Sequence, residues 1–186
     1  MFIALDMDGT LLTSDGQISE RNKEAIVAAQ KAGHIVAIAT GRAYKDAHEP
    51  LAKANIVSPI IGLNGALITQ ADGTVVCDVP LHKKTLIPLL EWVRTQPDLY
   101  CEIYTNEAVY VGLHNREHLE TLARQVSDRY PQLQRIVQKQ FQQARVTYIQ
   151  DISEVWNNGS LLFYKVLIFS LHLPSLYKFS LKFRHV

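Results

Sequence analysis

The first 63 residues alternate between short apolar runs and longer amphipathic stretches, and this alternation restricts the fold more than any other feature. The apolar runs have the length of buried strands, whereas the stretches between them repeat apolar residues at helical spacing. The predicted strands are 2–5, 35–39 and 59–63, and the predicted helices are 20–32 and 44–54. This order predicts an α/β fold with a parallel sheet and right-handed crossover connections.

Single residues mark the ends of the two predicted helices. Ser19 is suited to cap the first helix, and Gly33 is suited to end it. Pro50 is expected to bend or shorten the second helix because proline has no N–H group.

The pattern changes after Asn64. Segments 66–69 and 74–79, joined by Ala71-Asp72-Gly73, are typical of a hairpin. The segments that follow are predicted helices at 84–95 and 116–129 and predicted strands at 100–104, 108–111, 145–149 and 161–169. This α+β pattern predicts a second domain. The predicted organisation is a core part at residues 1–81, a second domain at 82–170 and an atypical tail at 171–186.

Composition narrows the classes of protein and of partner. With 186 residues, 47% of them apolar, the chain is long enough for a sizeable core. A net charge of +1 gives no argument for a nucleic acid or an anionic membrane as partner, and no apolar run is long enough to predict a membrane span. Cys77 and Cys101 have neither a disulfide framework nor a zinc-ligand spacing. Without a recognisable signal peptide, the expected location is cytoplasmic, and the oligomeric state is left open.

The last part of the chain departs from this ordinary composition. No Asp or Glu follows Glu154, and residues 171–186 show no clean helical or strand period. One interpretation is a buried C-terminal strand with a loose end. The other, which we favour, is that the natural sequence is cut short or altered here.

Polar residues follow each of the three N-terminal strands. Asp6-Met7-Asp8-Gly9-Thr10 follows the first, Thr40-Gly41-Arg42 the second and Asn64-Gly65 the third. In open α/β sheets, ligands bind outside the carboxyl ends of the strands. The three segments are therefore expected to meet at one site.

The first segment predicts phosphoryl transfer. Asp6 can attack phosphorus as a nucleophile, and Asp8 can act as general acid and then as general base. Two adjacent carboxylates repel each other and a phosphate, so Asp6 and Asp8 are expected to hold Mg²⁺. Gly9 permits the turn, and Thr10 offers a hydroxyl and an N–H to phosphate oxygens. The alternative for Asp6 and Asp8 is a helix cap followed by a turn residue.

The other two segments fit the same role but are weaker signals alone. Thr40 can donate its hydroxyl to phosphate, and Gly41 leaves the backbone accessible. Arg42 is expected to begin a helix whose N-terminus favours anions, and it could bind substrate or an acidic neighbour. Asn64 and Gly65 could place an amide and an N–H at the rim. Taken separately, these segments are most often plain turns.

The segments Asp6-Met7-Asp8-Gly9-Thr10-Leu11-Leu12, Ala39-Thr40-Gly41-Arg42 and Leu63-Asn64-Gly65-Ala66 together resemble the haloacid dehalogenase superfamily, and within it the Cof-type phosphatases. The resemblance implies a Rossmann-like core with an inserted α+β cap domain and a Mg²⁺ cofactor. It also implies activity on small phosphorylated metabolites such as sugar phosphates, nucleotides or flavin mononucleotide. In this resemblance Asp6 is the nucleophile and a metal ligand, Asp8 is the acid/base and a ligand through its carbonyl, and Thr40 binds phosphate.

One part of the family pattern is missing. The family continues with a lysine and a Gly-Asp-x-x-Asn-Asp segment that supplies further carboxylates, and this chain has no acidic residue after Glu154. Two hypotheses remain: an active Mg²⁺-dependent phosphatase, or a truncated, inactive relative that at most binds phosphate. If returning core strands are absent, an apolar edge of the first or second strand is expected to be exposed.

Overall fold

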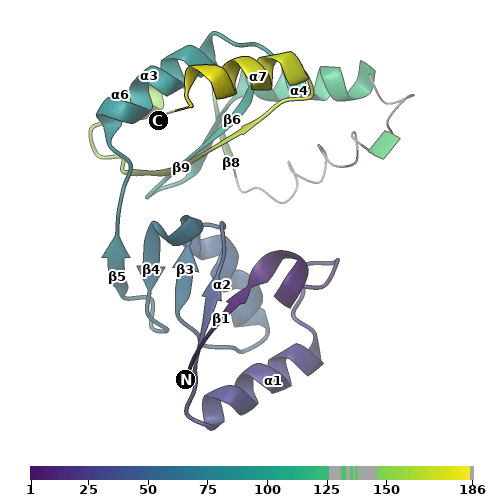
Figure 1. The fold of residues 1–186 in the computed structure, drawn as a ribbon, viewed down its shortest axis with the longest axis vertical. Coiled ribbons are helices and arrows are strands. Elements are labelled where there is room, and N and C mark those ends of the chain that lie inside the picture. Colours follow the sequence, from purple (N-terminus) through teal and green to yellow (C-terminus); the bar gives the residue numbers. More distant parts are fainter. Residues whose placement is uncertain (126–130, 133–134, 136, 138–145, 185–186) are drawn as a thin grey trace. The chain divides into compact units, whose positions relative to one another are not determined.

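The computed structural model describes residues 1–125, 131–132, 135, 137 and 146–184. Contacts divide the chain into two units, Met1–Pro80 and Leu81–Val186. Each unit contains its own β-sheet (Figure 1). No helix in the described ranges is both long and apolar enough to cross a lipid bilayer.

The sheet of the first unit has five strands in the order β1-β2-β3-β4-β5. They are β1 (Phe2–Asp6), β2 (Ile35–Ala39), β3 (Ile60–Gly62), β4 (Leu67–Thr69) and β5 (Val75–Asp78). The first three run parallel, and β4 and β5 form an antiparallel hairpin beside β3. The parallel strands and the hairpin confirm the predicted α/β fold, with no strand end displaced by more than one residue.

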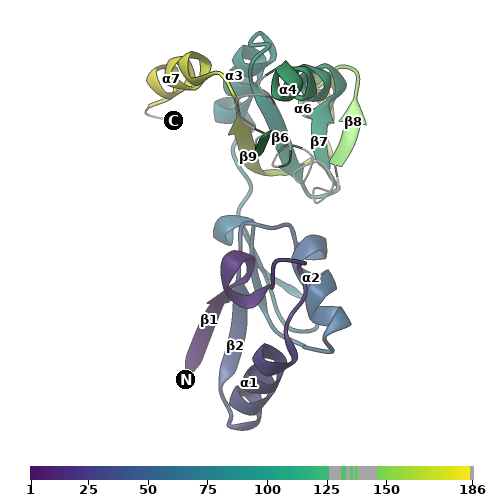
Figure 2. The same ribbon diagram turned by 90° about the vertical axis from the view of Figure 1, so that its right-hand side faces the viewer.

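Two helices, α1 (Glu20–Lys31) and α2 (Tyr44–Lys53), cover one face of this sheet (Figure 2). The Oγ of Ser19 accepts a hydrogen bond of 3.2 Å from the N–H of Asn22, so the predicted helix cap is present. The apolar core that joins the helices to the strands includes Ile26, Val36, Ile38, Leu51 and Ile60. Their burial fixes the helices against the strands and so fixes the loops at the strand ends.

Helix α2 continues past Pro50 to Lys53, so it is not shortened at the proline as one prediction had it. Pro50 cannot donate the usual helical hydrogen bond to the carbonyl of Asp46, four residues earlier. The Nη1 of Arg42 donates to this carbonyl at 3.3 Å. A side chain from the preceding loop thus bonds to the carbonyl that the proline cannot reach.

Strand β1 forms an edge of the sheet. Within the part of the chain that the structure describes, it has a strand partner on one side, β2. On the face opposite α1, Phe2 is 58% exposed and the neighbouring Ile35 is 57% exposed. Among the described strands, β1 therefore has one open edge, and an open strand edge can pair with another strand.

The sheet of the second unit has four strands in the order β8-β7-β6-β9. They are β6 (Tyr100–Thr105), β7 (Val109–Gly112), β8 (Val146–Ile149) and β9 (Phe163–Phe169). The pairs β6–β7 and β6–β9 are antiparallel, and β7–β8 is parallel. One core joins the sheet to α3 (Lys83–Arg94), α6 (Ser153–Asn157) and α7 (Leu173–Lys182), and another joins it to α4 (Leu113–Gln125).

The helices of this unit differ from the prediction in three places. Helix α4 begins at Leu113 instead of residue 116, and residues 126–129 of the predicted helix lie outside the described residues. Helix α6 was not predicted. The interpretation of the tail as a buried strand was wrong because α7 forms there, with Pro174 in its first turn and Leu176 and Phe179 packed on the core.

Candidate active site

The three polar segments follow the ends of three adjacent parallel strands. Asp6 closes β1 and is level with Ala39, the last residue of β2, and Ala39 is level with Ile61 of β3. The segments that follow these residues therefore leave the sheet at the same edge. This arrangement agrees with the expectation that the three segments meet.

Hydrogen bonds join the second segment to the third. The N–H of Leu63 donates to the carbonyl of Arg42 at 2.9 Å, and the N–H of Asn64 donates to the carbonyl of Thr40 at 3.2 Å. Leu63, Asn64 and Gly65 all have positive φ, at 50°, 59° and 95°. Leucine and asparagine are strained in this conformation by about 1–2 kcal/mol each. The backbone of this turn is therefore strained, and it directs the N–H groups of Leu63 and Asn64 to the carbonyls of the second segment.

An ion pair joins the first segment to the second. The Nη2 of Arg42 lies 2.6 Å from Oδ1 of Asp8, and its Nε lies 2.9 Å from Oδ2. Two parallel bonds between a guanidinium and a carboxylate fix both planes. The hydrogen bond to Asp8 raises the pKa of the Arg42 guanidinium above its ordinary value, so Arg42 stays charged. The expectation that Arg42 could bind an acidic neighbour is confirmed.

The first segment exposes its two acids and buries two apolar residues, Met7 and Leu11. Met7 is fully buried and Leu11 is 4% exposed, whereas Asp6 and Asp8 are exposed. The side chain of Asp6 makes no helix-capping hydrogen bond, which argues against the alternative that it is a structural cap. Met7 and Leu11 thus anchor the segment, and the two carboxylates face solvent.

Gly9 makes this arrangement possible because its φ is +77°. A Cβ placed on Gly9 meets no heavy atom within 4 Å, so Gly9→Ala is expected to cost only the strain of the left-handed conformation, about 1–2 kcal/mol of unfolding free energy. Gly159→Ala is a matched control, because its Cβ also meets nothing and its φ is not positive. Urea unfolding of both variants tests this, and equal losses would contradict it.

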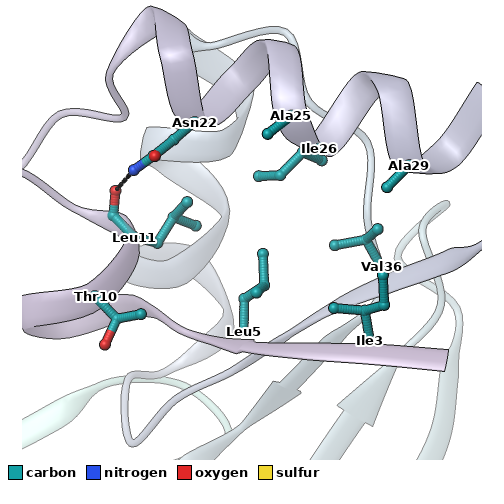
Figure 3. Close-up of a pocket in the computed structure, with 9 residues that line it drawn as sticks. All are labelled: Ile3, Leu5, Thr10, Leu11, Asn22, Ala25, Ile26, Ala29 and Val36. Atoms are coloured by element: carbon teal, nitrogen blue, oxygen red, sulfur yellow. Dashed lines mark hydrogen bonds between the residues drawn. The ribbon is translucent and has the colours of Figure 1, made fainter.

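The hydroxyl groups of the two predicted threonines differ in environment. Thr40 is 7% exposed, and its Oγ1 accepts a hydrogen bond of 3.2 Å from the N–H of Arg42, which leaves the hydroxyl hydrogen as a donor. Thr10 is exposed and lies at one end of an apolar groove, with its hydroxyl turned away from the cavity (Figure 3). Both hydroxyls remain predicted phosphate contacts.

The groove in Figure 3 lies between α1 and the strands β1 and β2 and has a volume of about 270 Å³. Its lining includes Ile3, Leu5, Ile26 and Val36, and the amide of Asn22 donates to the carbonyl of Leu11 at 3.0 Å beside it. The lining is chiefly aliphatic, so the groove is unsuited to a phosphate group.

The first segment offers oxygen ligands of the type that a hard cation binds. Mg²⁺ binds carboxylate and carbonyl oxygens and commonly keeps several waters, so the Asp6 carboxylate and the Asp8 carbonyl fit it chemically. In the described ranges, no cluster of three or more His, Cys, Asp or Glu side chains is positioned to hold a metal ion.

Sequence reasoning missed the residues that hold Arg42 in place. The carbonyl of Asp46 accepts its Nη1, and a Cβ on Gly62 would meet the Arg42 carbonyl at 3.2 Å. The available signal was Pro50, four residues after Asp46 within a helical stretch, since such a proline leaves the carbonyl four residues earlier without its helical donor.

Comparisons with known proteins give a consistent assignment. The family model of haloacid dehalogenase-like hydrolases matches residues 3–174. Phosphatase YwpJ of Bacillus subtilis is 30% identical over 174 residues, which cover 90% of this chain and 61% of that protein. The 5-amino-6-(5-phospho-D-ribitylamino)uracil phosphatase YwtE of the same species is 28% identical over 188 residues, covering 98% and 64%. The chain thus spans less than two thirds of the length of these curated relatives.

A solved structure agrees with the sequence comparisons. The structure of a haloacid dehalogenase-like hydrolase from B. subtilis matches with a TM-score of 0.81 at 29% identity, covering 100% of this chain and 67% of that chain.

Proposed function

Because the chain belongs to the haloacid dehalogenase-like hydrolase family, we propose that it hydrolyses phosphate monoesters of small metabolites through Asp6 and Asp8. The observation that carries this proposal is the joining of three strand ends by the Asp8–Arg42 ion pair and the Asn64–Thr40 hydrogen bond. Ligands of open α/β sheets bind at such strand ends. The phosphate is expected to contact Gly9, Thr10, Thr40, Gly41, Arg42, Asn64 and Gly65.

The proposed reaction has two steps. In the first, a carboxylate oxygen of Asp6 bonds to phosphorus while the ester oxygen leaves with a proton from Asp8. In the second, water attacks phosphorus, Asp8 takes its proton, and phosphate leaves Asp6. The exposure of both carboxylates is consistent with access for the ester and for the water.

The proposed cofactor is Mg²⁺, held by Asp6 and by Asp8. When bound, Mg²⁺ neutralises charge between the carboxylates and the phosphate. Arg42 supplies positive charge from the protein, and the N-terminus of α2 favours an anion beside it.

The proposed substrates are sugar phosphates, nucleotides or flavin mononucleotide. The name of YwtE describes a phosphorylated ribityl compound, which is a small phosphate ester of this kind. The identities to relatives of about 30% support the class of substrate and leave the compound itself to experiment.

A second candidate function is phosphate binding without turnover. It is favoured by the small number of metal-ligand candidates, since no three acidic, His or Cys residues in the described ranges form a cluster. Fewer carboxylates around Mg²⁺ would weaken the charge stabilisation that phosphoryl transfer needs.

One assay separates the two candidates. The purified chain is incubated with p-nitrophenyl phosphate and Mg²⁺, and then with excess EDTA. For a Mg²⁺-dependent phosphatase, EDTA is expected to lower the rate about a hundredfold or more. Absence of hydrolysis in Mg²⁺, together with calorimetric binding of inorganic phosphate, would favour the second candidate.

A further inference from the structure

The guanidinium of Arg42 is held on two edges. One edge, Nε and Nη2, faces Asp8 at 2.9 and 2.6 Å, and Nη1 donates to the carbonyl of Asp46 at 3.3 Å. The main chain of Arg42 is also fixed, since its N–H donates to Thr40 Oγ1 and its carbonyl accepts from Leu63. Arg42 therefore has a defined place that does not depend on Asp8 alone.

Pro50 makes the Asp46 carbonyl available to this side chain, and we call this carbonyl the seat of Arg42. In an uninterrupted helix, the residue at position 50 would donate to the carbonyl of Asp46. Proline has no N–H, and the carbonyl receives Nη1 of Arg42 at 3.3 Å. Because Pro50 is buried within α2, this seat is part of the rigid scaffold.

The pair that Arg42 makes with Asp8 is suited to exchange. The side chain of Asp8 is 60% exposed and that of Arg42 is 29% exposed, so water and dissolved anions reach the pair. Exposed pairs are worth only about 0.2–1 kcal/mol. A guanidinium fork binds phosphate oxygens with the same two-bond geometry as a carboxylate, and a phosphate dianion carries more charge.

We propose that Arg42 is a positioning latch for Asp8, seated by Pro50 through the Asp46 carbonyl, which releases Asp8 when a phosphate group takes its place on the guanidinium. The proposal rests on the proposed function, because it assumes that the phosphate binds at these strand ends. The latch keeps the acid/base carboxylate in one orientation in the empty site. When the phosphate group of the ester replaces Asp8 on the Arg42 guanidinium, the Asp8 carboxylate becomes free to act.

A double-mutant cycle on phosphate binding tests the latch. Calorimetry without Mg²⁺ and at physiological ionic strength gives the Kd of inorganic phosphate for the wild-type chain, Asp8→Asn, Arg42→Gln and the double variant. Asp8→Asn removes the competitor and is expected to tighten binding about fivefold. In the Arg42→Gln background the same substitution is expected to change Kd less than about twofold, since no latch remains.

The outcomes distinguish the latch from the proposed function. Equal gains from Asp8→Asn in both backgrounds would indicate simple charge repulsion and would overturn the latch alone. No binding of phosphate to the wild-type chain would overturn the proposed site and the latch with it. Arg42→Lys keeps the positive charge but lacks the two-bond geometry of the guanidinium. In the Arg42→Lys background, the change in phosphate Kd caused by Asp8→Asn is therefore expected to lie between the changes in the wild-type and Arg42→Gln backgrounds.

A remote substitution tests the seat. Pro50→Ala restores an N–H that competes for the Asp46 carbonyl, and the Nε–Hε NMR resonance of Arg42 is expected to shift. Pro88→Ala is the matched control because Pro88 lies within α3 of the second unit. A shift in Pro50→Ala and none in Pro88→Ala supports the seat, whereas an unchanged Arg42 resonance in Pro50→Ala would overturn it.

Discussion

Asp6→Asn is expected to lower the rate of p-nitrophenyl phosphate hydrolysis by about a thousandfold or more, because an amide is a very poor nucleophile toward phosphorus. The same substitution is expected to change the unfolding free energy by less than about 0.5 kcal/mol, since Asp6 is exposed and its side chain makes no helix-capping hydrogen bond. A large loss of activity without a loss of stability would separate a chemical role from a structural one.

Asp15→Asn is a suitable control for Asp6→Asn. Asp15 is an exposed acid in the loop before α1 and accepts a hydrogen bond from Thr13 within that loop. Its substitution is expected to leave the rate unchanged within about twofold. If Asp6→Asn kept more than a tenth of the wild-type rate, Asp6 would not be the nucleophile.

Leu161→Ala is expected to destabilise the second unit by about 3–5 kcal/mol. Leu161 is 1% exposed and packs in the core with Leu90, Ile103 and Trp156. Its truncation removes buried apolar contacts and leaves a cavity. The two tryptophans of the chain, Trp92 and Trp156, both lie in this unit, so their fluorescence during urea unfolding measures the loss.

The adjacent leucine provides the matched control. Leu162 is 40% exposed, and its contacts with Asn106 use the main chain, which Leu162→Ala leaves in place. The expected loss is below about 1 kcal/mol. If the two variants unfolded at the same urea concentration, the described burial of Leu161 would be incorrect.

The first half of the fold could be predicted because its signals are local. Strands β1, β2 and β3 are apolar runs that polar segments end, and Ser19 lies where a helix cap was expected. Such runs have few alternatives once helical stretches separate them. Helix α7 escaped prediction because Tyr177 and Leu181 lie exposed on the face opposite the core and obscure the apolar period.

Contacts between distant residues were harder to anticipate. The sequence offered an acidic neighbour as one partner of Arg42, and only strand register identifies that neighbour as Asp8. Glu102 is a second case, since a charged residue is expected at the surface. It is fully buried and accepts hydrogen bonds from Tyr100 and Tyr104 at 3.0 and 2.7 Å.

The spacing of these residues explains Glu102 in retrospect. Tyr100, Glu102 and Tyr104 alternate along β6 and so lie on one face of the sheet. The phenol groups replace water around the carboxylate, and the pKa of the Tyr100 hydroxyl is raised by its burial first and by Glu102 second. The two tyrosines thus provide the hydrogen bonds that a buried acid needs.

The order of strands in the two sheets has a consequence for synthesis on the ribosome. All five described strands of the first sheet have been synthesised once β5 has emerged, whereas β6 of the second unit pairs with β7 and must wait for its other neighbour, β9. At roughly 5–20 residues per second, β9 follows β5 by several seconds. We therefore expect the first sheet to form while the second still lacks β9, so that the unpaired edge of nascent β6 depends on shielding from other chains during that interval.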